Sequence, residues 1–375
     1  MQDNIYKFLR IYKNKSYDEV PLTEADVLIG TMISYADFYS LSKTKKYDLE
    51  NNTLKFEEFN VKKYLDKLAK NYFNGDEAKK LLETLFKAKR YRLTKIGYFQ
   101  NELSSDNMTQ FFALTAITKN YVCIFFRGTD DSLVGWKENL DMMFKDKLPS
   151  QKLAKKYLYK IAELTNKPII IAGHSKGGNL AFYSYLTASK KIQNRVFRVY
   201  NFDGPGFKNQ DVTINDNVPK LIKMVPSNDI VGMILENTDN YQIIKSYKKN
   251  VAAHDLFTRA FSSKTRYTML KKNPPLSKYS VALKNTINIW MDKYNKKDYK
   301  DMVDFIYEIA ISNKQSSTLK LKLDIIKKRK IYLEKISSYS TKKKEKMKAM
   351  TREFVKIYFS TLFGRIVIEN NKQGD

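Results

Sequence analysis

The chain has 375 residues, of which 43% are hydrophobic and 13% aromatic, so it can bury the core of one large domain or two smaller ones. The N-terminal stretch is charged throughout and no apolar run approaches the length that spans a bilayer, so we expect a cytoplasmic protein. A single cysteine, Cys123, excludes an intramolecular disulfide and a CxxC metal site, and its setting in YVCIFF predicts a buried strand residue.

The formal net charge of +28 is unevenly placed, because residues 265–375 hold 26 Lys and Arg against 11 Asp and Glu. No RRM, helix-turn-helix or zinc-finger signature accompanies these charges, so no specific nucleic acid is expected as a partner. We interpret the lysines as solvated helix faces. Binding to an anionic membrane surface or to nucleic acid is the alternative, and it would place the protein at the membrane periphery.

Residues 1–96 have a mostly helical pattern. Thr23 and Asp26 are placed as a capping box ahead of an apolar run, and GDEAKKLLETLFKAKRY predicts another helix. We interpret this region as an N-terminal helical segment that packs on, or caps, the core that follows.

Residues 97–265 change to short β-branched and aromatic runs, such as QFFALTAI, YVCIFF, PIIIAG and KLIKMV, with helical stretches between several of them. This alternation predicts an α/β core with a mostly parallel sheet covered on both faces. Residues 266–375 lack strand signals and predict Lys-rich amphipathic helices, which would form a C-terminal helical extension.

The stretch PIIIAGHSKGGNLAFYSYL places Gly173, Ser175 and Gly177 between a short apolar strand and a helix. This G-x-S-x-G spacing in a strand-turn-helix context is typical of a nucleophile elbow, where a strained bend exposes the serine hydroxyl and glycines relieve the crowding around it. A tight turn in which the serine only caps the helix is the alternative for this pentapeptide taken alone.

A serine hydroxyl is a weak nucleophile and needs a base. Of the two histidines, His174 lies inside the turn, where we expect its side chain to point away from the reaction centre and to serve packing or orientation. His254 follows the last predicted strand, and Asp229 in VPSNDIVG supplies a carboxylate to orient it. The order Ser175, Asp229, His254 is that of α/β-hydrolases, although a satisfied core histidine is the alternative for His254.

An acyl-transfer site also needs hydrogen-bond donors for an oxyanion. The backbone N–H of Lys176 follows the nucleophile, and Thr129 at the end of the CIFFRGT strand can offer both its N–H and its hydroxyl. Taken alone, the CIFFRGT strand and the residues after it also fit an ordinary strand exit in which Asp130 and Asp131 are turn residues.

Together these pieces resemble the class 3 lipase branch of the α/β-hydrolases. The matching residues are Phe126–Thr129, Trp136, Gly173–Gly177, Asn228–Val231 and His254. The segments SYADF, FRGTDDSLVGWKENL, GHSKGGNLA, VYNFDGPGF and VPSNDIVGMILE look more closely similar to an uncharacterised bacterial lipase-like family known only as a domain of unknown function. The resemblance implies a lipase-like α/β-hydrolase fold and supplies no substrate.

One departure from the lipase pattern is Asp203 in NFDGPGF, an alternative acid for the histidine. We predict a serine hydrolase that cleaves a carboxylic ester through Ser175, Asp229 and His254, with Thr129 and Lys176 as the oxyanion hole and no metal or organic cofactor. A catalytically inactive hydrolase-fold binding protein is the alternative.

Near the C-terminus, a helix would place Phe354, Ile357, Tyr358 and Leu362 on one face, close to the preceding lysines. This face predicts either attachment to anionic lipid or, as in most soluble proteins, packing on the rest of the chain.

Overall fold

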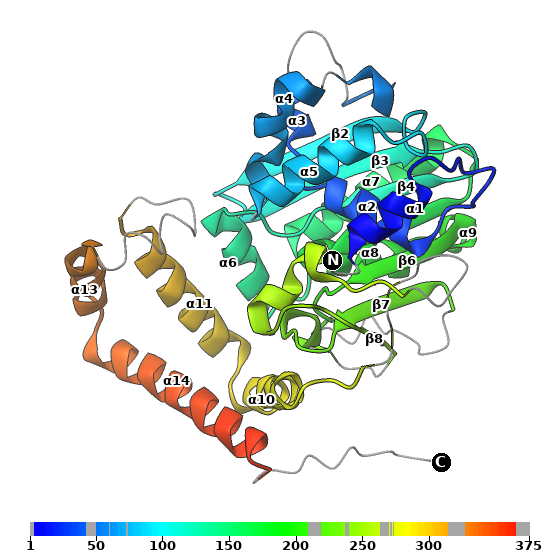
Figure 1. Cartoon of the computed structure of the whole chain (residues 1–375). Helices are drawn as coiled ribbons and strands as arrows, with labels where there is room; N and C mark the ends of the chain where they lie inside the picture. The colour runs from blue at the N-terminus through cyan, green and yellow to red at the C-terminus, as the bar shows by residue number, and fades with distance from the viewer. Residues whose placement is uncertain are drawn as a thin grey trace.

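The structure is a computed structural model that describes residues 4–42, 50–59, 61–72, 74–208, 219–236, 240–262, 270, 272, 274–313 and 327–364 (Figure 1). The N-terminal elements are α1 (Ile5–Tyr12), α2 (Glu24–Ile33), α3 (Phe38–Ser42), β1 (Thr53–Lys55), α4 (Val61–Leu68) and α5 (Gly75–Phe86). The central elements are β2 (Lys95–Ser104), β3 (Thr109–Ile117), β4 (Val122–Phe126), α6 (Leu133–Asp141), α7 (Pro149–Leu164), β5 (Ile169–His174), α8 (Lys176–Leu186), α9 (Lys190–Arg195), β6 (Val196–Phe202), β7 (Leu221–Pro226) and β8 (Gln242–Ile244). The C-terminal helices are α10 (Lys278–Lys293), α11 (Lys296–Ile311), α13 (Arg329–Ser337) and α14 (Thr341–Leu362).

The eight strands form one sheet in the order of the chain. Strands β4 to β8 are parallel to one another, and β1 to β4 pair antiparallel. The predicted fold class is therefore confirmed: an α/β sheet with N-terminal helices before it and C-terminal helices after it. The capping box of Thr23 and Asp26 is also present at the start of α2.

Residues 1–96, whose pattern is mostly helical, also contain β1 and the start of β2, which extend the sheet with an antiparallel edge. The register of β2 against β3 shifts between Gly97 and Gln100, and Tyr98 there has a φ of 51°. Such a bulge interrupts the alternation of inward and outward side chains, and that alternation is the signal from which a strand is predicted.

The sheet is covered on both faces. In β4, Cys123 and Phe125 point into a core shared with the N-terminal helices, while Ile124 and Phe126 point into a second core formed with α7 and α8. Cys123 is a buried strand residue, as predicted. Because the N-terminal helices supply one whole side of this core, they are part of the sheet domain and not only a cap.

The C-terminal helices form a smaller core of their own with Phe144, which lies just after α6 (Figure 1). An ion pair of 2.9 Å between Lys137 of α6 and Asp304 of α11 joins this unit to the sheet domain. The sequence predicted an apolar face on the helix that is α14 in the structure. Ile357 of that face is buried and Phe354 packs in this core, so the face is turned inward. Within the described part of the chain, no helix is long and apolar enough to cross a bilayer.

Candidate active site

Ser175 occupies the turn between β5 and α8, with φ 57° and ψ −130°. A non-glycine residue in such a sparsely populated conformation costs on the order of 1–3 kcal/mol, so the surrounding structure must hold it. The Ser175 N–H donates to the Phe202 carbonyl at 3.0 Å, and the Ser175 carbonyl accepts from the Gly178 N–H at 2.9 Å. The backbone is therefore strained in the way that the G-x-S-x-G spacing predicts.

The glycines around the serine are required by close backbone approaches. A Cβ atom added to Gly173 would lie 2.0 Å from the carbonyl oxygen of Gly177, and one added to Gly177 would lie 2.1 Å from that of Phe126. A Cβ atom at Gly128 would lie 3.0 Å from the Cβ of Ser175. The segment that leaves β4 therefore runs beside the serine, where the sequence predicted an oxyanion donor.

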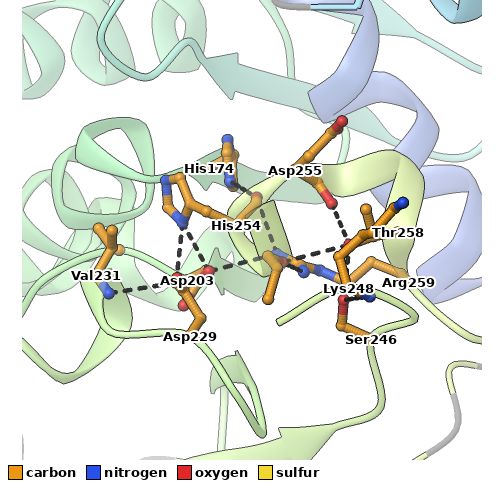
Figure 2. Close-up of polar contacts among 12 residues, drawn as sticks. His174, Asp203, Asp229, Val231, Ser246, Lys248, His254, Asp255, Thr258 and Arg259 are labelled. Atoms are coloured by element: carbon orange, nitrogen blue, oxygen red, sulfur yellow. Dashed lines mark hydrogen bonds and ion pairs between the residues drawn. The ribbon is translucent and has the colours of Figure 1, made fainter. Parts of the chain in front are cut away.

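The imidazole of His254 contacts both candidate acids (Figure 2). Its Nδ1 lies 2.7 Å from Oδ2 of Asp203 and 3.0 Å from Oδ2 of Asp229, and both carboxylates are fully buried. The sequence treated these acids as competitors for the histidine. The structure brings them together at one nitrogen, which leaves Nε2 as the ring atom that can exchange a proton with a serine hydroxyl.

The two carboxylates alter the protonation of this cluster. Burial acts to lower the pKa of His254, but Asp203 and Asp229 outweigh it and raise that pKa to about 9. Burial, followed by the neighbouring charge of Asp229, raises the pKa of Asp203 to about 7. Burial would also raise the pKa of Asp229, but its hydrogen bonds with Asp203 and His254 have the larger effect and lower that pKa. Asp229 is therefore the ionised acid at neutral pH.

Arg259 completes the charge balance and was not predicted from the sequence. Its Nη2 lies 3.4 Å from Oδ2 of Asp203 and 3.2 Å from the carbonyl oxygen of His254, and its Nη1 donates to the carbonyl of Ala253 (Figure 2). The guanidinium is buried, so it offsets the charge of the two carboxylates while also tying down the backbone that carries the histidine.

The sequence led us to expect that the His174 side chain points away from the reaction centre. In the structure its ring lies beside that of His254, the candidate base. Its ring centroid lies 4.4 Å from that of His254, its Nε2 lies 2.9 Å from the His254 carbonyl oxygen, and its Nδ1 lies 2.8 Å from the Tyr35 hydroxyl. Its expected role in packing or orientation fits these contacts. Tyr35 belongs to the SYADF segment, so a signal for it was present in the sequence.

One candidate oxyanion donor directly follows Ser175, and the other belongs to the segment that runs beside it. Thr129 lies three residues beyond β4, and its Oγ1 accepts a hydrogen bond of 2.6 Å from the amide of Asn139. Lys176 is the first residue of α8, so its backbone N–H has no acceptor within the helix.

The side chain of Lys176 has a separate role that the sequence did not reveal. It is fully buried, and its Nζ lies 2.8 Å from Oε2 of Glu138 and 2.6 Å from both the carbonyl and side-chain oxygens of Gln110. Glu138 also accepts from the backbone N–H of Gln110 and of Ser150. One buried carboxylate thus connects β3, α6, α7 and α8 behind the serine turn.

Ligand atoms of His174, Asp203 and His254 lie within 4.8 Å of one another, the spacing of a metal site. However, both ring nitrogens of His174 are engaged in hydrogen bonds, and the guanidinium of Arg259 already faces Asp203. The group is therefore better suited to hold a protonated imidazole than a metal cation.

The model of the Mbeg1-like family matches residues 85–308, a range that contains every candidate site residue except Tyr35. No curated protein and no solved structure matches the chain. The matched range covers more than half of the sequence and most of the sheet described above. The chain therefore belongs to the Mbeg1-like family, with a lipase-like α/β domain.

Proposed function

We propose that the protein is a serine hydrolase that cleaves a carboxylic ester, either a lipid or another acylated alcohol. Ser175 is the nucleophile, His254 is the general base and acid, and the paired carboxylates of Asp203 and Asp229 orient the imidazole. Lys176 contributes a backbone donor to the oxyanion hole, and Thr129 contributes the second one.

One observation carries this proposal: the strained Ser175 directly follows His174, whose ring centroid lies 4.4 Å from that of His254, and the Nδ1 of His254 is held by buried carboxylates. A serine that only capped α8 would have no need of the left-handed backbone, and a histidine that only filled the core would have no need of two acids. The combination is that of an activated nucleophile with an oriented base.

In the proposed reaction, Nε2 of neutral His254 takes the hydroxyl proton of Ser175 as its oxygen attacks the ester carbonyl. The tetrahedral oxyanion collapses when the imidazolium returns the proton to the leaving alcohol, which leaves an acyl-serine. Water, deprotonated by the same nitrogen, then attacks the acyl-serine and releases a carboxylic acid and the free Ser175 hydroxyl.

Labelling with a fluorophosphonate probe and hydrolysis of short p-nitrophenyl esters test the proposal. Ser175→Ala should abolish labelling and lower kcat/KM by about 10³-fold or more, because only oxyanion and binding contributions remain. Ser105→Ala, in the turn between β2 and β3, is the matched control and should label and hydrolyse like the wild type. If Ser175→Ala retains labelling, Ser175 is not the nucleophile.

The raised pKa of His254 favours one alternative, a hydrolase-fold protein that binds ligands without turnover at neutral pH, since a protonated imidazole cannot accept the serine proton. Repeating the labelling above about pH 9, where the ring is neutral, separates the two functions. Labelling that rises with pH supports the hydrolase, and its absence at every pH supports the binding protein.

A further inference from the structure

Three residues from separate parts of the chain form a hydrogen-bonded series that ends on the backbone of the candidate base. The Tyr35 hydroxyl lies 2.8 Å from Nδ1 of His174, and Nε2 of His174 lies 2.9 Å from the carbonyl oxygen of His254. Tyr35 and His174 are both buried, so water does not compete for these bonds.

The direction of each bond follows from elementary chemistry. A carbonyl oxygen only accepts, so Nε2 of His174 must carry a proton. Burial, assisted by the nearby positive charges of His254 and Arg259, lowers the pKa of His174 well below its usual value, so the ring is neutral and its Nδ1 has no proton. The Tyr35 hydroxyl therefore donates to Nδ1, and this donation selects the tautomer whose Nε2–H holds the His254 carbonyl.

His254 depends on such support because it does not lie in a strand or a long helix. It ends a short 3₁₀ helix, Asn250–His254, and its carbonyl oxygen receives hydrogen bonds from His174 and from Arg259. The ring of His174, tilted by 35° relative to that of His254, restricts the same residue from the side. Contacts from His174 of β5 and from Arg259 thus hold the backbone of this stretch, and Tyr35 supports it through His174.

We propose that Tyr35 and His174 are positioning residues that keep His254 aligned with Ser175, with Tyr35 acting by setting the tautomer of His174. The inference rests on the proposed hydrolase function. It gives the N-terminal segment a direct part in the site, because Tyr35 lies two residues after the end of α2 and its hydroxyl begins the series of hydrogen bonds.

Tyr35→Phe removes the donor to Nδ1 and a hydrogen bond with the Gly128 backbone. We expect kcat for p-nitrophenyl esters to fall about tenfold with KM unchanged, as for a small loss of alignment. His174→Gln keeps an N–H near the position of Nε2 and should retain more activity than His174→Leu. Tyr157→Phe is the matched control, because its buried hydroxyl donates to the Tyr98 carbonyl at 2.7 Å away from the site. If Tyr35→Phe lowers kcat no more than Tyr157→Phe, the role of Tyr35 is only structural and the proposal fails.

A second measurement does not depend on turnover. The chain has only two histidines, so ¹⁵N-histidine labelling yields two imidazole signals that can be assigned with His174→Gln. We expect His174 to be a neutral Nε2–H tautomer that does not titrate over the pH range in which a free histidine does, and to change its tautomer balance in Tyr35→Phe. Titration of His174 in that range, or an Nδ1–H tautomer in the wild type, would overturn the inference even if the protein proved catalytically inactive.

A separate observation concerns the outward face of α14. Val355, Phe359 and Phe363 recur every four residues and are 45%, 51% and 68% exposed, on the side opposite the buried Met350 and Ile357. Arg352 and Lys356 are exposed between and beside them. A helix with apolar residues on both sides is normally buried, yet within the described chain this outer side remains in contact with solvent.

We also infer that this outer stripe docks on an anionic lipid surface. Apolar side chains that enter the acyl boundary, flanked by cations that attract lipid phosphate, are what an interfacial helix presents. The cationic flanks and the net charge of +28 make an anionic surface the complementary partner. The face differs from the one predicted by sequence, which packs inward.

Co-sedimentation with phosphatidylcholine vesicles, with and without phosphatidylglycerol, tests this surface. The wild type should sediment only with anionic vesicles and lose binding as salt rises. Phe359→Ser with Phe363→Ser, and separately Arg352→Glu with Lys356→Glu, should each weaken binding by about tenfold or more. Leu103→Ser, at an exposed leucine of β2, is the control and should bind like the wild type.

Failure of the wild type to sediment with anionic vesicles at low salt would overturn the inference. So would equal loss in the Leu103→Ser control, or a concentration-dependent dimer that dissociates in the double phenylalanine variant, since a second copy of the chain would then cover the stripe. Because this readout needs no ester hydrolysis, its outcome is independent of the proposed function.

Discussion

At the scale of single residues, the unusual feature is an imidazole shared by two acids. In a site with one acid, replacing it with Asn reverses the tautomer preference and costs about 10⁴-fold in kcat. Here either carboxylate can still accept from Nδ1 of His254 after the other has been replaced. Sequence order alone favoured Asp229 with Asp203 as the alternative, and the geometry gives both a contact.

We predict that Asp229→Asn lowers kcat more than Asp203→Asn, because Asp229 is the acid that is ionised at neutral pH. Each single variant should lose less than the double variant, for which we expect about 10⁴-fold. Steady-state kinetics with p-nitrophenyl esters measure the three losses. A tenfold or smaller loss in the double variant would show that neither acid orients the base.

The same carboxylates set the pH dependence of kcat/KM. Since they raise the pKa of His254 to about 9, the neutral base becomes available only as pH rises through that value, and kcat/KM should increase across that range. Removing one carboxylate makes the imidazolium less stable, lowers the pKa of His254, and moves the rise in kcat/KM to lower pH. A profile of Asp203→Asn that coincides with the wild type would contradict this coupling.

At the scale of elements, the buried pair of Lys176 and Glu138 holds the start of α8 against β3, α6 and α7. Breaking a buried pair leaves one uncompensated charge, which costs about 3–5 kcal/mol in free energy of unfolding. We therefore expect Lys176→Met to lower the free energy of unfolding strongly in urea titration. The double variant, Lys176→Met with Glu138→Gln, should lose less of this free energy than the sum of the losses in the two single variants.

The exposed ion pair of Lys119 and Asp18, 2.7 Å apart, provides the control for that measurement. Lys119→Met should change the free energy of unfolding by less than about 1 kcal/mol, because water screens the pair. Equal effects of Lys176→Met and Lys119→Met would mean that the buried pair does not support the serine turn.

At the scale of the whole molecule, the N-terminal and C-terminal helical regions differ in whether they share a hydrophobic core with the sheet. Ile5, Phe8, Leu28 and Met32 of the N-terminal helices share one core with the sheet, whereas α10, α11 and α14 surround a separate core. The size of a region in the sequence is therefore a poor guide to its contribution to folding.

We predict that deleting residues 276–375 leaves a protein that unfolds cooperatively in urea and still labels at Ser175, because every site residue and the sheet remain. Deleting the much shorter segment 1–36 should abolish cooperative unfolding, since it uncovers one face of the sheet. Circular dichroism of both truncations during urea titration makes the comparison. The reverse result would show that the sheet depends on the C-terminal helices.

The sequence by itself determined the features that arise within a few neighbouring residues. The serine turn could be predicted because its glycines, apolar strand and helix are contiguous, and a crowded bend admits few residue types at Gly173 and Gly177. The parallel strands could be predicted because strands buried on both faces are continuously apolar, as β4 and β5 are. The bulged β2 could not, since its alternation is broken at Gly97.

Only the tertiary structure decided which distant residues meet. Asp203 and Asp229 reach the same nitrogen of His254 because β6 and β7 are adjacent parallel strands that end at the same edge of the sheet, and a single sequence does not give the paths of the loops beyond them. Tyr35 and Arg259 also reach the site from distant parts of the chain, across sequence separations too long for a local pattern to reveal. The apolar residues of α14 were visible in the sequence, but the side that faces solvent depends on where α10 packs against it.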